Sequence, residues 1–264
     1  MLSPGSFFDF KDWVHGDLLA KREIVWQVLA DLKNYILKVL QPNLYTLVRS
    51  GPLLQETAVL YQDKLLSSGF ELHPGDATKG KYKVIKDGEV LEGATVFYAG
   101  ACLMDDDIHV GPGSVIEPGA LIKGPTIIGS YCEIRQGAYL RGHCLVGNRC
   151  VVGHTTEMKH SVMLDGAKAG HFASIGDSIL GGGTNLGAGT KLANLKIAGG
   201  LVVLKINEKI YETGLRKFGA IVGDGTETGC NSVTNPGTLL GRHCSVYPAV
   251  SVKSGYYHDH SVVR

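Results

Sequence analysis

The chain has 264 residues, a formal net charge of +1 and only 19% charged residues, so its composition gives no general basic field for nucleic acid. No apolar run approaches the roughly 18 residues of a membrane span, so no membrane partner is expected. The 36 glycines, without a proline-rich or low-complexity bias, are typical of an ordered chain that turns every few residues.

The N-terminal residues 1–95 lack any repeat and are predicted to form a mixed, largely helical cap. The first residues, MLSPGSFFDFKDW, show no basic segment followed by a long apolar core, so no secretory signal and a cytoplasmic setting are expected. An amphipathic helix is predicted over about 17–40, and a second helix over 54–68. Residues 81–100 then predict strand, Asp-Gly turn and strand. This cap should cover the first coil of the repeat that follows, whose strand edges would otherwise be unpaired.

Residues 108–196 repeat every six residues. Apolar residues occupy ten consecutive positions six apart: Val110, Ile116, Ile122, Ile128, Ile134, Leu140, Val146, Val152, Met158 and Leu164. A small or modest residue follows four places after each of the first eight: Ser114, Ala120, Thr126, Cys132, Ala138, Cys144, Cys150 and Thr156. This pattern predicts a hexapeptide β-helix, in which three rungs make one triangular coil, the aliphatic residue points inward and the small residue fits a corner. Glycines such as Gly111, Gly129, Gly147 and Gly153 are expected where the backbone turns with positive φ.

The repeat pauses after Asn194, where residues 195–218 alternate as a Gly-centred hairpin inserted between coils, and it resumes at Val222. The frame continues at three aliphatic positions and weakens at two threonines: Leu240, Val246, Val252, Thr228 and Thr234. The predicted fold is therefore mainly β. We expect a parallel β-helix of about seven coils over residues 96–264, with an N-terminal helical cap and an inserted hairpin.

The six cysteines form no CxxC pair and no zinc spacing. Cys132, Cys144 and Cys150 occupy the small-residue position of the repeat, and Cys244 occupies it again in the distal part. These four are interpreted as buried, inert core thiols in a reducing setting.

Residues 18 apart are expected to lie one above another on adjacent coils, about 4.8 Å apart. Three cations share this spacing and each follows an inward aliphatic: Lys123, Arg141 and Lys159. They should project outward in a line, with Asp105 and Asp177 only at its ends. Stacked like charges repel, and an Arg with a Lys is a common phosphate clamp, so an anion-binding column is one hypothesis.

The alternative for this column is a solvated face neutralised by Glu157, two residues from Lys159, or by Glu133. Spacing alone does not decide between the two.

His171 also follows an inward position and lies in a glycine-rich passage, KAGHFASIGDSILGGGTNLGAGT, where small residues let a ligand approach the backbone. A histidine side chain can take a proton from an amine or hydroxyl near neutral pH. Because the chain has ten histidines, a structural role is the alternative.

The segment GHTTEMKHSVMLDGAKAGHFASIGDSILGGGTNLGAGTKLANLK closely resembles the acetyltransferase domain of bifunctional enzymes that make UDP-N-acetylglucosamine from glucosamine-1-phosphate. The archaeal sugar-1-phosphate nucleotidylyltransferase/acetyltransferase type is nearest in pattern. The similarity covers about residues 108–255 and includes IKGPTIIG, YLRG, EMKHSV, KAGH, NLGAGT, the hairpin insertion and LRKFGAIVG. It implies a left-handed β-helix, acetyl-CoA as co-substrate and an amino sugar phosphate as acceptor.

The resemblance also implies roles on the acceptor side. His171 matches the family's catalytic base, which takes a proton from the sugar amine as it attacks the thioester. Arg141 and Lys159 match residues that hold the sugar phosphate or nucleotide phosphates. Asn185 matches a sugar-contacting Asn, and Lys217 in LRKFGA matches a lysine near the phosphate side.

On the acetyl-CoA side, Ala188 and Asn194 match positions that line the groove, and backbone amides around Ala188 are expected to stabilise the oxyanion. Three positions depart from the family pattern. Ser174 replaces a Tyr of the sugar site, Leu195 replaces a Tyr beside the groove Asn, and Cys230 replaces a Ser in the same groove.

Enzymes of this family are trimers with each site assembled between neighbouring prisms, so a homotrimer is expected. Residues 1–95 contain no Gly-rich LxxGxGTRxxPLT-like loop, so no nucleotidyltransferase activity is expected from them.

Three other hypotheses stay open. A different amine or hydroxyl acceptor would keep His171 while changing the pocket near Ser174. A γ-class carbonic anhydrase would share the fold, but His154 and His160 have five residues between them where that class has four, so no metal site is predicted. A noncatalytic trimeric scaffold, whose cap binds a partner, predicts no turnover with any amine.

Overall fold

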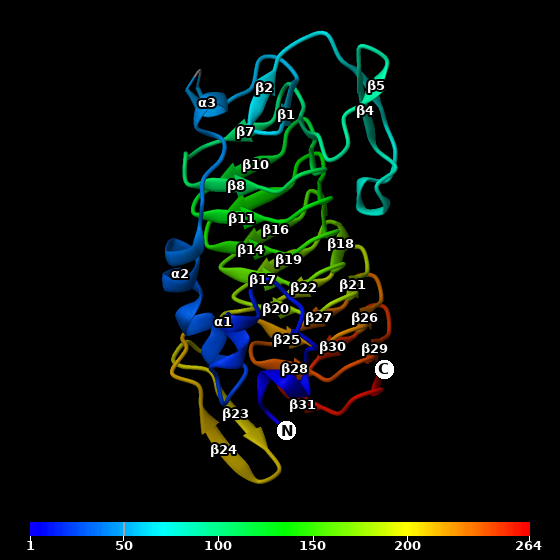
Figure 1. Cartoon of the computed structure of the whole chain (residues 1–264). Helices are drawn as coiled ribbons and strands as arrows, with labels where there is room; N and C mark the ends of the chain where they lie inside the picture. The colour runs from blue at the N-terminus through cyan, green and yellow to red at the C-terminus, as the bar shows by residue number, and fades with distance from the viewer. Residues whose placement is uncertain (50) are drawn as a thin grey trace.

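The computed structural model describes residues 1–49 and 51–264, and most of them form a triangular prism of stacked parallel strands (Figure 1). Each turn of the chain adds one strand to face 1, then one to face 2 and one to face 3. We call the bend between faces 1 and 2 the first corner, and the bend between faces 2 and 3 the second corner. The predicted mainly β, parallel β-helix architecture is confirmed.

Within the described residues, face 1 has nine parallel strands: β6 (Thr95–Phe97), β9 (Val115–Ile116), β12 (Glu133–Ile134), β15 (Val151–His154), β18 (Lys168–His171), β21 (Asn185–Leu186), β26 (Glu227–Thr228), β29 (Ser245–Val246) and β32 (Val262–Val263). Face 2 consists of β7 (Cys102–Leu103), β10 (Leu121–Lys123), β13 (Tyr139–Arg141), β16 (Glu157–Lys159), β19 (Ser174–Gly176), β22 (Lys191–Leu192), β27 (Val233–Thr234) and β30 (Ser251–Val252). Face 3 consists of β8 (Ile108–Val110), β11 (Thr126–Ile128), β14 (Cys144–Val146), β17 (Ser161–Met163), β20 (Ile179–Leu180), β25 (Ala220–Val222), β28 (Thr238–Leu240) and β31 (Gly255–Tyr257).

The solenoid makes about nine turns, which is more than the predicted seven. The first turn begins at Thr95, before the six-residue frame is recognisable, and the last reaches Val263. The two threonines that weaken the frame, Thr228 and Thr234, are buried at inward positions. The hydroxyl of Thr228 lies 2.8 Å from that of Thr190, so paired polar groups replace aliphatic packing in this part of the core.

Inside the prism, the aliphatic positions from Val110 to Met158 and the small residues between Ser114 and Thr156 are all buried, as predicted. The prediction that Leu164 points inward is wrong. Val146 pairs with Met163, so this coil is one residue shorter than the frame requires. Met163 fills the interior, whereas Leu164 packs with the N-terminal segment outside the prism.

The expected role of four glycines is also wrong: Gly111, Gly129, Gly147 and Gly153 do not have positive φ. They are needed because adjacent coils approach closely, and a Cβ on Gly129 would lie 2.5 Å from the carbonyl oxygen of Gly147. Left-handed corner positions are taken by other residues, including non-glycines such as Tyr131 with φ of 55°.

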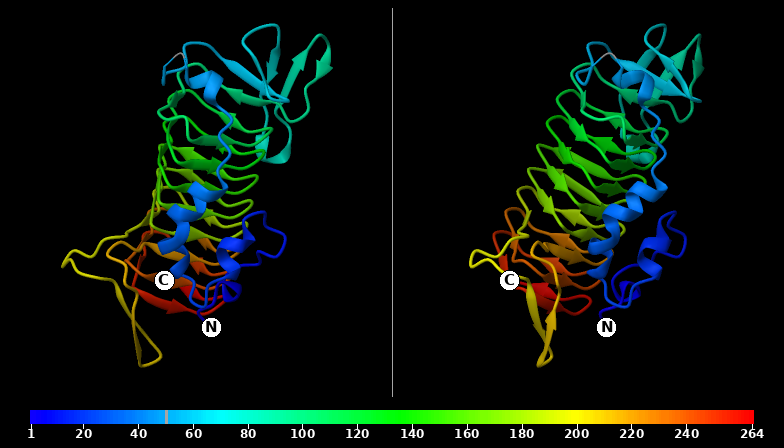
Figure 2. Two further views of the ribbon diagram at one scale, coloured as in Figure 1. Left: turned by 60° about the vertical axis from the view of Figure 1, so that its left-hand side comes forward. Right: turned by 90° about the vertical axis from the view of Figure 1, so that its left-hand side faces the viewer.

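The helix predicted over residues 17–40 is divided into α1 (Gly16–Ala20) and α2 (Gln27–Val39), after a short 3-10 turn, η1 (Pro4–Ser6). These elements lie along the outside of face 3 instead of covering the first coil (Figure 2). Their apolar side chains form one buried cluster with outward residues of face 3: Phe7, Trp26, Leu29, Leu32, Ile127, Leu145, Val162, Ile179 and Ile221.

The beginning of this segment contacts the distal coils. The backbone N–H of Asp9 donates to Asp224 Oδ2 at 2.6 Å, and Arg242 Nη2 donates to the carbonyl oxygen of Gly5 at 3.0 Å. The N-terminal segment therefore spans the prism from its last turns toward its first.

The first coil is covered by the chain that follows α2. Leu44, Leu47 and Leu54, around α3 (Tyr45–Val48), belong to the interior core of the prism. The second helix predicted over residues 54–68 is wrong, because this stretch forms the antiparallel strands β1 (Ala58–Tyr61) and β2 (Lys64–Leu66). Their two-residue turn has positive φ, a hairpin geometry that matches the twist of the strands. β1 pairs with β6 and extends face 1.

A small antiparallel sheet projects beside this end of the prism: β3 (Glu71–His73), β4 (Lys83–Lys86) and β5 (Glu89–Val90). β4 and β5 are joined at the predicted Asp-Gly turn. Between β3 and β4, a strap that contains the 3-10 turn η2 (Ala77–Lys79) returns to face 1.

The inserted hairpin consists of β23 (Val203–Ile206) and β24 (Lys209–Glu212). It turns at Asn207 and Glu208, both with positive φ, and not at a glycine. Among the described residues, no helix is long and apolar enough to cross a bilayer.

Candidate active site

The three predicted cations lie on the outer side of face 2. Lys123 pairs directly with Arg141, and the register of β13 with β16 carries the stack on to Lys159. Lys159 then pairs with Gly176, so the expectation that Asp177 ends the column is wrong. The shortened coil moves Asp177 to the second corner.

Glu157 neutralises part of this column. Its carboxylate lies 2.5 Å from Arg141 Nη1, and both side chains are half exposed. Arg141 also stands 5.8 Å from the centre of the Tyr139 ring. Glu133, the other neutralising candidate, instead pairs with Arg135 on face 1. The solvated-face alternative is thus partly right for Arg141.

Lys159 has no ion-pair partner among the residues that the structure describes. It is half-buried at the end of β16, next to the second corner. Lys123 has no ion-pair partner among these residues either, so two cations of the column are available to an anionic ligand.

His171 lies at the first corner, at the end of β18, with an exposed side chain. It stacks below His154 of the preceding coil. The exposed ring of Phe172 lies 6.2 Å from that of His171 and 5.2 Å from that of His154. His171 therefore stands free on the surface beside an aromatic side chain.

Ala188 and Cys230 occupy the same corner on the next two coils. The N–H of Gly189 donates to the carbonyl oxygen of His171 at 3.0 Å, and the N–H of Asn231 donates to that of Ala188 at 2.8 Å. This ladder stacks His171, Ala188 and Cys230 in one column. Cys230 is exposed.

The GAG segment offers one free amide. Gly187 N donates to Thr228 O at 2.9 Å and Gly189 N donates to His171 O, so both are occupied by the coil ladder. In the described part of the chain, the N–H of Ala188 has no acceptor within hydrogen-bond distance. It is the amide in this segment that is able to bind an oxyanion.

Ser174 lies on β19, just past the first corner from His171, between Glu157 and Lys191 in the neighbouring strands. Its short side chain is half-buried.

Asn194 lies at the second corner, where its side chain is held by Asp177. Asn194 Nδ2 donates to Asp177 Oδ2 at 2.6 Å, and His160 Nδ1 lies 2.8 Å from Asp177 Oδ1. The Asp177 side chain is only 8% exposed, and its two oxygens are both used. Because the amide nitrogen of Asn194 is committed to Asp177, its carbonyl oxygen is left to accept from a ligand. A Cβ on Gly176 would lie 2.6 Å from Asn194 Nδ2, so this glycine makes room for the contact.

Sequence reasoning missed the role of Asp177 because it kept an 18-residue spacing throughout. The step of five residues between Met158 and the apolar Met163 was the available signal.

Leu195 and Lys217 pair with each other at the base of the inserted hairpin, next to Asn194. Phe218 N donates to Asn194 O at 2.9 Å, which anchors the base of the insertion to the second corner. Leu195 and Lys217 are both exposed.

Asn185 is the outlier of the predicted set. It begins β21 on face 1, between Lys168 and Glu227, and its side chain is exposed. Within one copy of the chain, Asn185 therefore lies on face 1, whereas the other predicted residues lie on face 2 or at its two corners.

The cysteines divide as expected between core and surface. Cys132, Cys144, Cys150 and Cys244 are buried. Burial raises the pKa of the Cys144 thiol to about 12 and raises those of Cys150 and Cys244. These thiols stay protonated at neutral pH and take no part in a site.

The two histidines weighed as zinc ligands lie apart. His154 is at the first corner, with Nδ1 3.0 Å from the carbonyl oxygen of Gln136, whereas His160 is at the second corner on Asp177. They do not share a ligand set.

The fold and these residues define a hexapeptide-repeat β-helix that bears a histidine, a free backbone amide and a column of cations on its surface. Residues 122–214 match the family model of the GMPPB C-terminal domain. The chain is 33% identical over 155 residues to the bifunctional sugar-1-phosphate nucleotidylyltransferase/acetyltransferase of Sulfurisphaera tokodaii, over 52% of this chain and 39% of the relative. It is 33% identical over 156 residues to the bifunctional protein GlmU of a Synechococcus species, over 56% of this chain and 31% of the relative. The resemblance predicted from the motifs is confirmed.

This chain thus spans well under half the length of these curated relatives. A solved structure of Francisella novicida UDP-N-acetylglucosamine acyltransferase aligns over 60% of each chain at 14% identity, with a TM-score of 0.27.

Proposed function

We propose that the protein is an acyltransferase that transfers an acetyl group from acetyl-CoA to the amine of an amino sugar phosphate, of the glucosamine-1-phosphate or galactosamine-1-phosphate type. The observation that carries the proposal is the stacking of His171 directly above Ala188 and Cys230, beside a face that bears Arg141 and Lys159. It puts a base and a free amide at the first corner, across face 2 from the cations proposed to bind the phosphate. The Sulfurisphaera tokodaii relative, whose name includes acetyltransferase, supports the same chemistry.

In the proposed reaction, the amine nitrogen of the acceptor forms a bond to the thioester carbon and the carbon–sulfur bond breaks. His171 takes the proton that the amine loses and returns one to the departing thiolate, so the products are the amide and free CoA. The N–H of Ala188 stabilises the negative oxygen of the tetrahedral intermediate.

The residues of face 2 position the acceptor. Lys159 supplies a positive charge next to the phosphate. Arg141 leaves its ion pair with Glu157 and donates two hydrogen bonds to the phosphate oxygens. Ser174 leaves space where a larger residue would contact the sugar.

The acetyl-CoA side of the site extends from Ala188 and Cys230 at the first corner to Asn194 at the second corner. Asp177 fixes Asn194 so that its amide oxygen accepts from an N–H of the pantetheine arm. Leu195 adds an exposed apolar surface at the same place, and Lys217 a positive charge.

We further propose that the chain acts as a cytoplasmic homotrimer. α1 and α2 cover face 3, which leaves faces 1 and 2 for contacts between copies. Asn185 on face 1 is then in place to complete the site on face 2 of a neighbouring copy. Sedimentation at several protein concentrations tests the assembly, and a monomer that acetylates at full rate would contradict it.

The reaction is tested by thiol release from acetyl-CoA with glucosamine-1-phosphate, galactosamine-1-phosphate and a panel of other amines. His171→Ala should lower kcat by at least about 100-fold. His154→Ala is the matched control, because it removes the same side chain one coil away. Equal acetylation rates in the wild-type protein and His171→Ala would show that His171 is not the general base.

Arg141→Ala and Lys159→Ala should raise the acceptor KM and leave the KM for acetyl-CoA unchanged. If acetyl-CoA binds but no amine is acetylated, the acceptor is of another class. If acetyl-CoA does not bind, a noncatalytic trimeric scaffold is the better description.

A further inference from the structure

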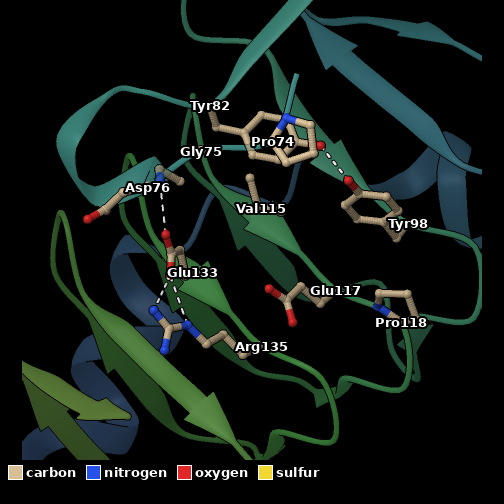
Figure 3. A pocket seen from close by; sticks show the side chains of 11 residues that line it. Pro74, Gly75, Asp76, Tyr82, Tyr98, Val115, Glu117, Pro118, Glu133 and Arg135 are labelled. Carbon is tan, nitrogen blue, oxygen red and sulfur yellow. Dashed lines mark hydrogen bonds and ion pairs between the residues drawn. The ribbon is translucent and has the colours of Figure 1, made fainter. Parts of the chain in front are cut away.

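A pocket of about 510 Å³ lies between the strap of the N-terminal cap and the outer side of face 1 (Figure 3). Pro74 and Tyr82 of the cap form one wall. Tyr98, Glu117 and Arg135 of the first coils form the other. The volume lies in the range of about 300–1,000 Å³ that is usual for small-molecule sites.

The two walls are fastened together. Glu133, buried below the pocket, accepts from the N–H of Ala77 at 2.9 Å through one oxygen, and from Arg135 Nε and Nη2 at 2.9 and 2.7 Å through the other. One coil below, Arg149 Nη1 donates to the carbonyl oxygen of Thr78 at 2.6 Å. These contacts hold the strap on face 1, so the pocket is formed before any ligand binds.

The tyrosines offer both apolar surface and hydroxyl groups. The hydroxyl oxygens of Tyr82 and Tyr98 are 2.5 Å apart. Burial and the neighbouring Tyr98 raise the pKa of Tyr82, so its hydroxyl stays neutral. One proton is used between the two oxygens, and the other is left to donate to a ligand.

The charged side chains of the pocket leave one negative charge unpaired. Glu133 is neutralised by Arg135, and Asp76 by Lys79 at 2.9 Å. Glu117 accepts from the N–H of Gln136 at 2.8 Å, and within the described residues it has no cationic partner. Its carboxylate lies between the tyrosine pair and Arg135 (Figure 3).

We propose that this pocket binds an unphosphorylated carbohydrate ring, with a preference for one that carries an amine. Aromatic rings pack on the apolar side of a sugar, a carboxylate accepts from its hydroxyl or ammonium groups, and a tyrosine hydroxyl donates to a ring substituent. An ammonium group beside Glu117 also gains from the tyrosine ring faces. The negative charge repels the sugar phosphates that face 2 is proposed to bind.

The pocket is separate from the proposed transfer site. Glu117 and Arg135 face outward on the coils of Ile116 and Ile134, whereas His171 belongs to the coil of Ala169, two coils beyond that of Ile134. The separation along the prism from Arg135 is about 10 Å. Binding in the pocket therefore does not depend on the proposed acetylation, and the two are tested independently.

The test is isothermal titration of the full chain with glucosamine, glucose and glucosamine-1-phosphate, in the Arg141→Ala/Lys159→Ala background, which removes both proposed phosphate contacts of the transfer site. Glucosamine should bind more tightly than glucose, and glucosamine-1-phosphate more weakly than either. Glu117→Gln, which keeps an oxygen for the N–H of Gln136, should raise the Kd for glucosamine about tenfold and the Kd for glucose less.

Glu89→Gln, on an exposed strand of the same cap, is the matched control and should leave both constants unchanged. Tyr98→Phe supplies a second variant that keeps the ring and removes one hydroxyl. The proposal is overturned if neither sugar binds saturably, or if Glu117→Gln and Tyr98→Phe both bind as the parent does.

Discussion

Asn194 donates its side-chain amide to Asp177 at 2.6 Å, across two adjacent coils of the second corner. Asp177→Asn should weaken this hold and raise the KM for acetyl-CoA about tenfold, because a charge-assisted hydrogen bond to a buried carboxylate is lost. Asn194→Ala should have a similar effect. The double variant should be no worse than the poorer single one, since both changes break the same contact.

The control for this cycle is Asp259→Asn, an exposed carboxylate of the last coil. Thermal unfolding of each variant separates a positioning effect from lost stability. Additive effects of Asp177→Asn and Asn194→Ala on the KM would show that the contact does not position Asn194.

Glu157 competes with an acceptor phosphate for Arg141. Glu157→Gln should therefore lower the acceptor KM by about two- to fivefold, the range expected for one surface ion pair. The effect should shrink at high salt, because exposed charges are screened. Glu212→Gln on the inserted hairpin is the control. An unchanged KM would mean that Arg141 does not contact the acceptor.

Cys230 provides a chemical probe of the proposed groove. In the native protein, an aromatic disulfide reagent should modify Cys230 and, more slowly, the half-buried Cys102, while Cys144 reacts only on unfolding because burial raises its pKa to about 12. Acetyl-CoA should slow the reaction of Cys230 but not that of Cys102. Equal rates with and without acetyl-CoA would place the ligand elsewhere.

The spacing of the coils can be tested with two glycines. Gly129→Ala should destabilise the fold by about 1–3 kcal/mol, because its Cβ would lie 2.5 Å from the carbonyl oxygen of Gly147. Gly170 has no atom within 4 Å of the corresponding position, so Gly170→Ala should leave the free energy of unfolding unchanged or raise it slightly. Denaturant titration compares the two variants, and similar losses in both would contradict the coil-contact explanation.

The stability of the fold should also decrease as the pH is lowered, because His15 is partly buried. This side chain lies 3.0 Å from the Tyr35 hydroxyl, and its pKa is lowered chiefly by burial. Below the ordinary histidine pKa of about 6.5, this histidine binds a proton in the unfolded chain but not in the folded chain. The free energy of unfolding therefore decreases as the pH falls from this value toward the lowered pKa of the folded state.

Melting temperatures at pH 7.5 and 5.5 measure this loss, and His15→Gln should reduce the difference between them. Part of the difference should remain, because burial also lowers the pKa of His143. The same pH difference in the variant would exclude His15 as a cause.

The six-residue frame predicted the prism because inward positions depend only on local sequence period. The prediction failed at Leu164, where the coil is one residue shorter than the frame requires. The hydrophobicity of Leu164 is the same whether its side chain points into the prism or is buried under another segment. Helical structure within residues 17–40 was predicted correctly, but its position on face 3 was not. Amphipathicity reveals that a helix has an apolar face and does not reveal which surface covers that face.

The candidate site was also predictable only in part. The column of Lys123, Arg141 and Lys159 follows from spacing, but the Arg141–Glu157 pair depends on side-chain rotamers. The contact of Asp177 with Asn194 depends on the shortened coil, so an unbroken repeat could not reveal it.

The contacts of Asp9 with Asp224, and of Gly5 with Arg242, join positions 215 and 237 residues apart. During synthesis, this segment leaves the ribosome before any of the surface that it covers, and its distal contacts form only after Asp224 and Arg242 have emerged. Its apolar side chains therefore stay partly uncovered while these coils are being made, a stage at which a chain is prone to aggregate. Deleting the coils from Asp224 onward should leave the beginning of the segment without its anchor.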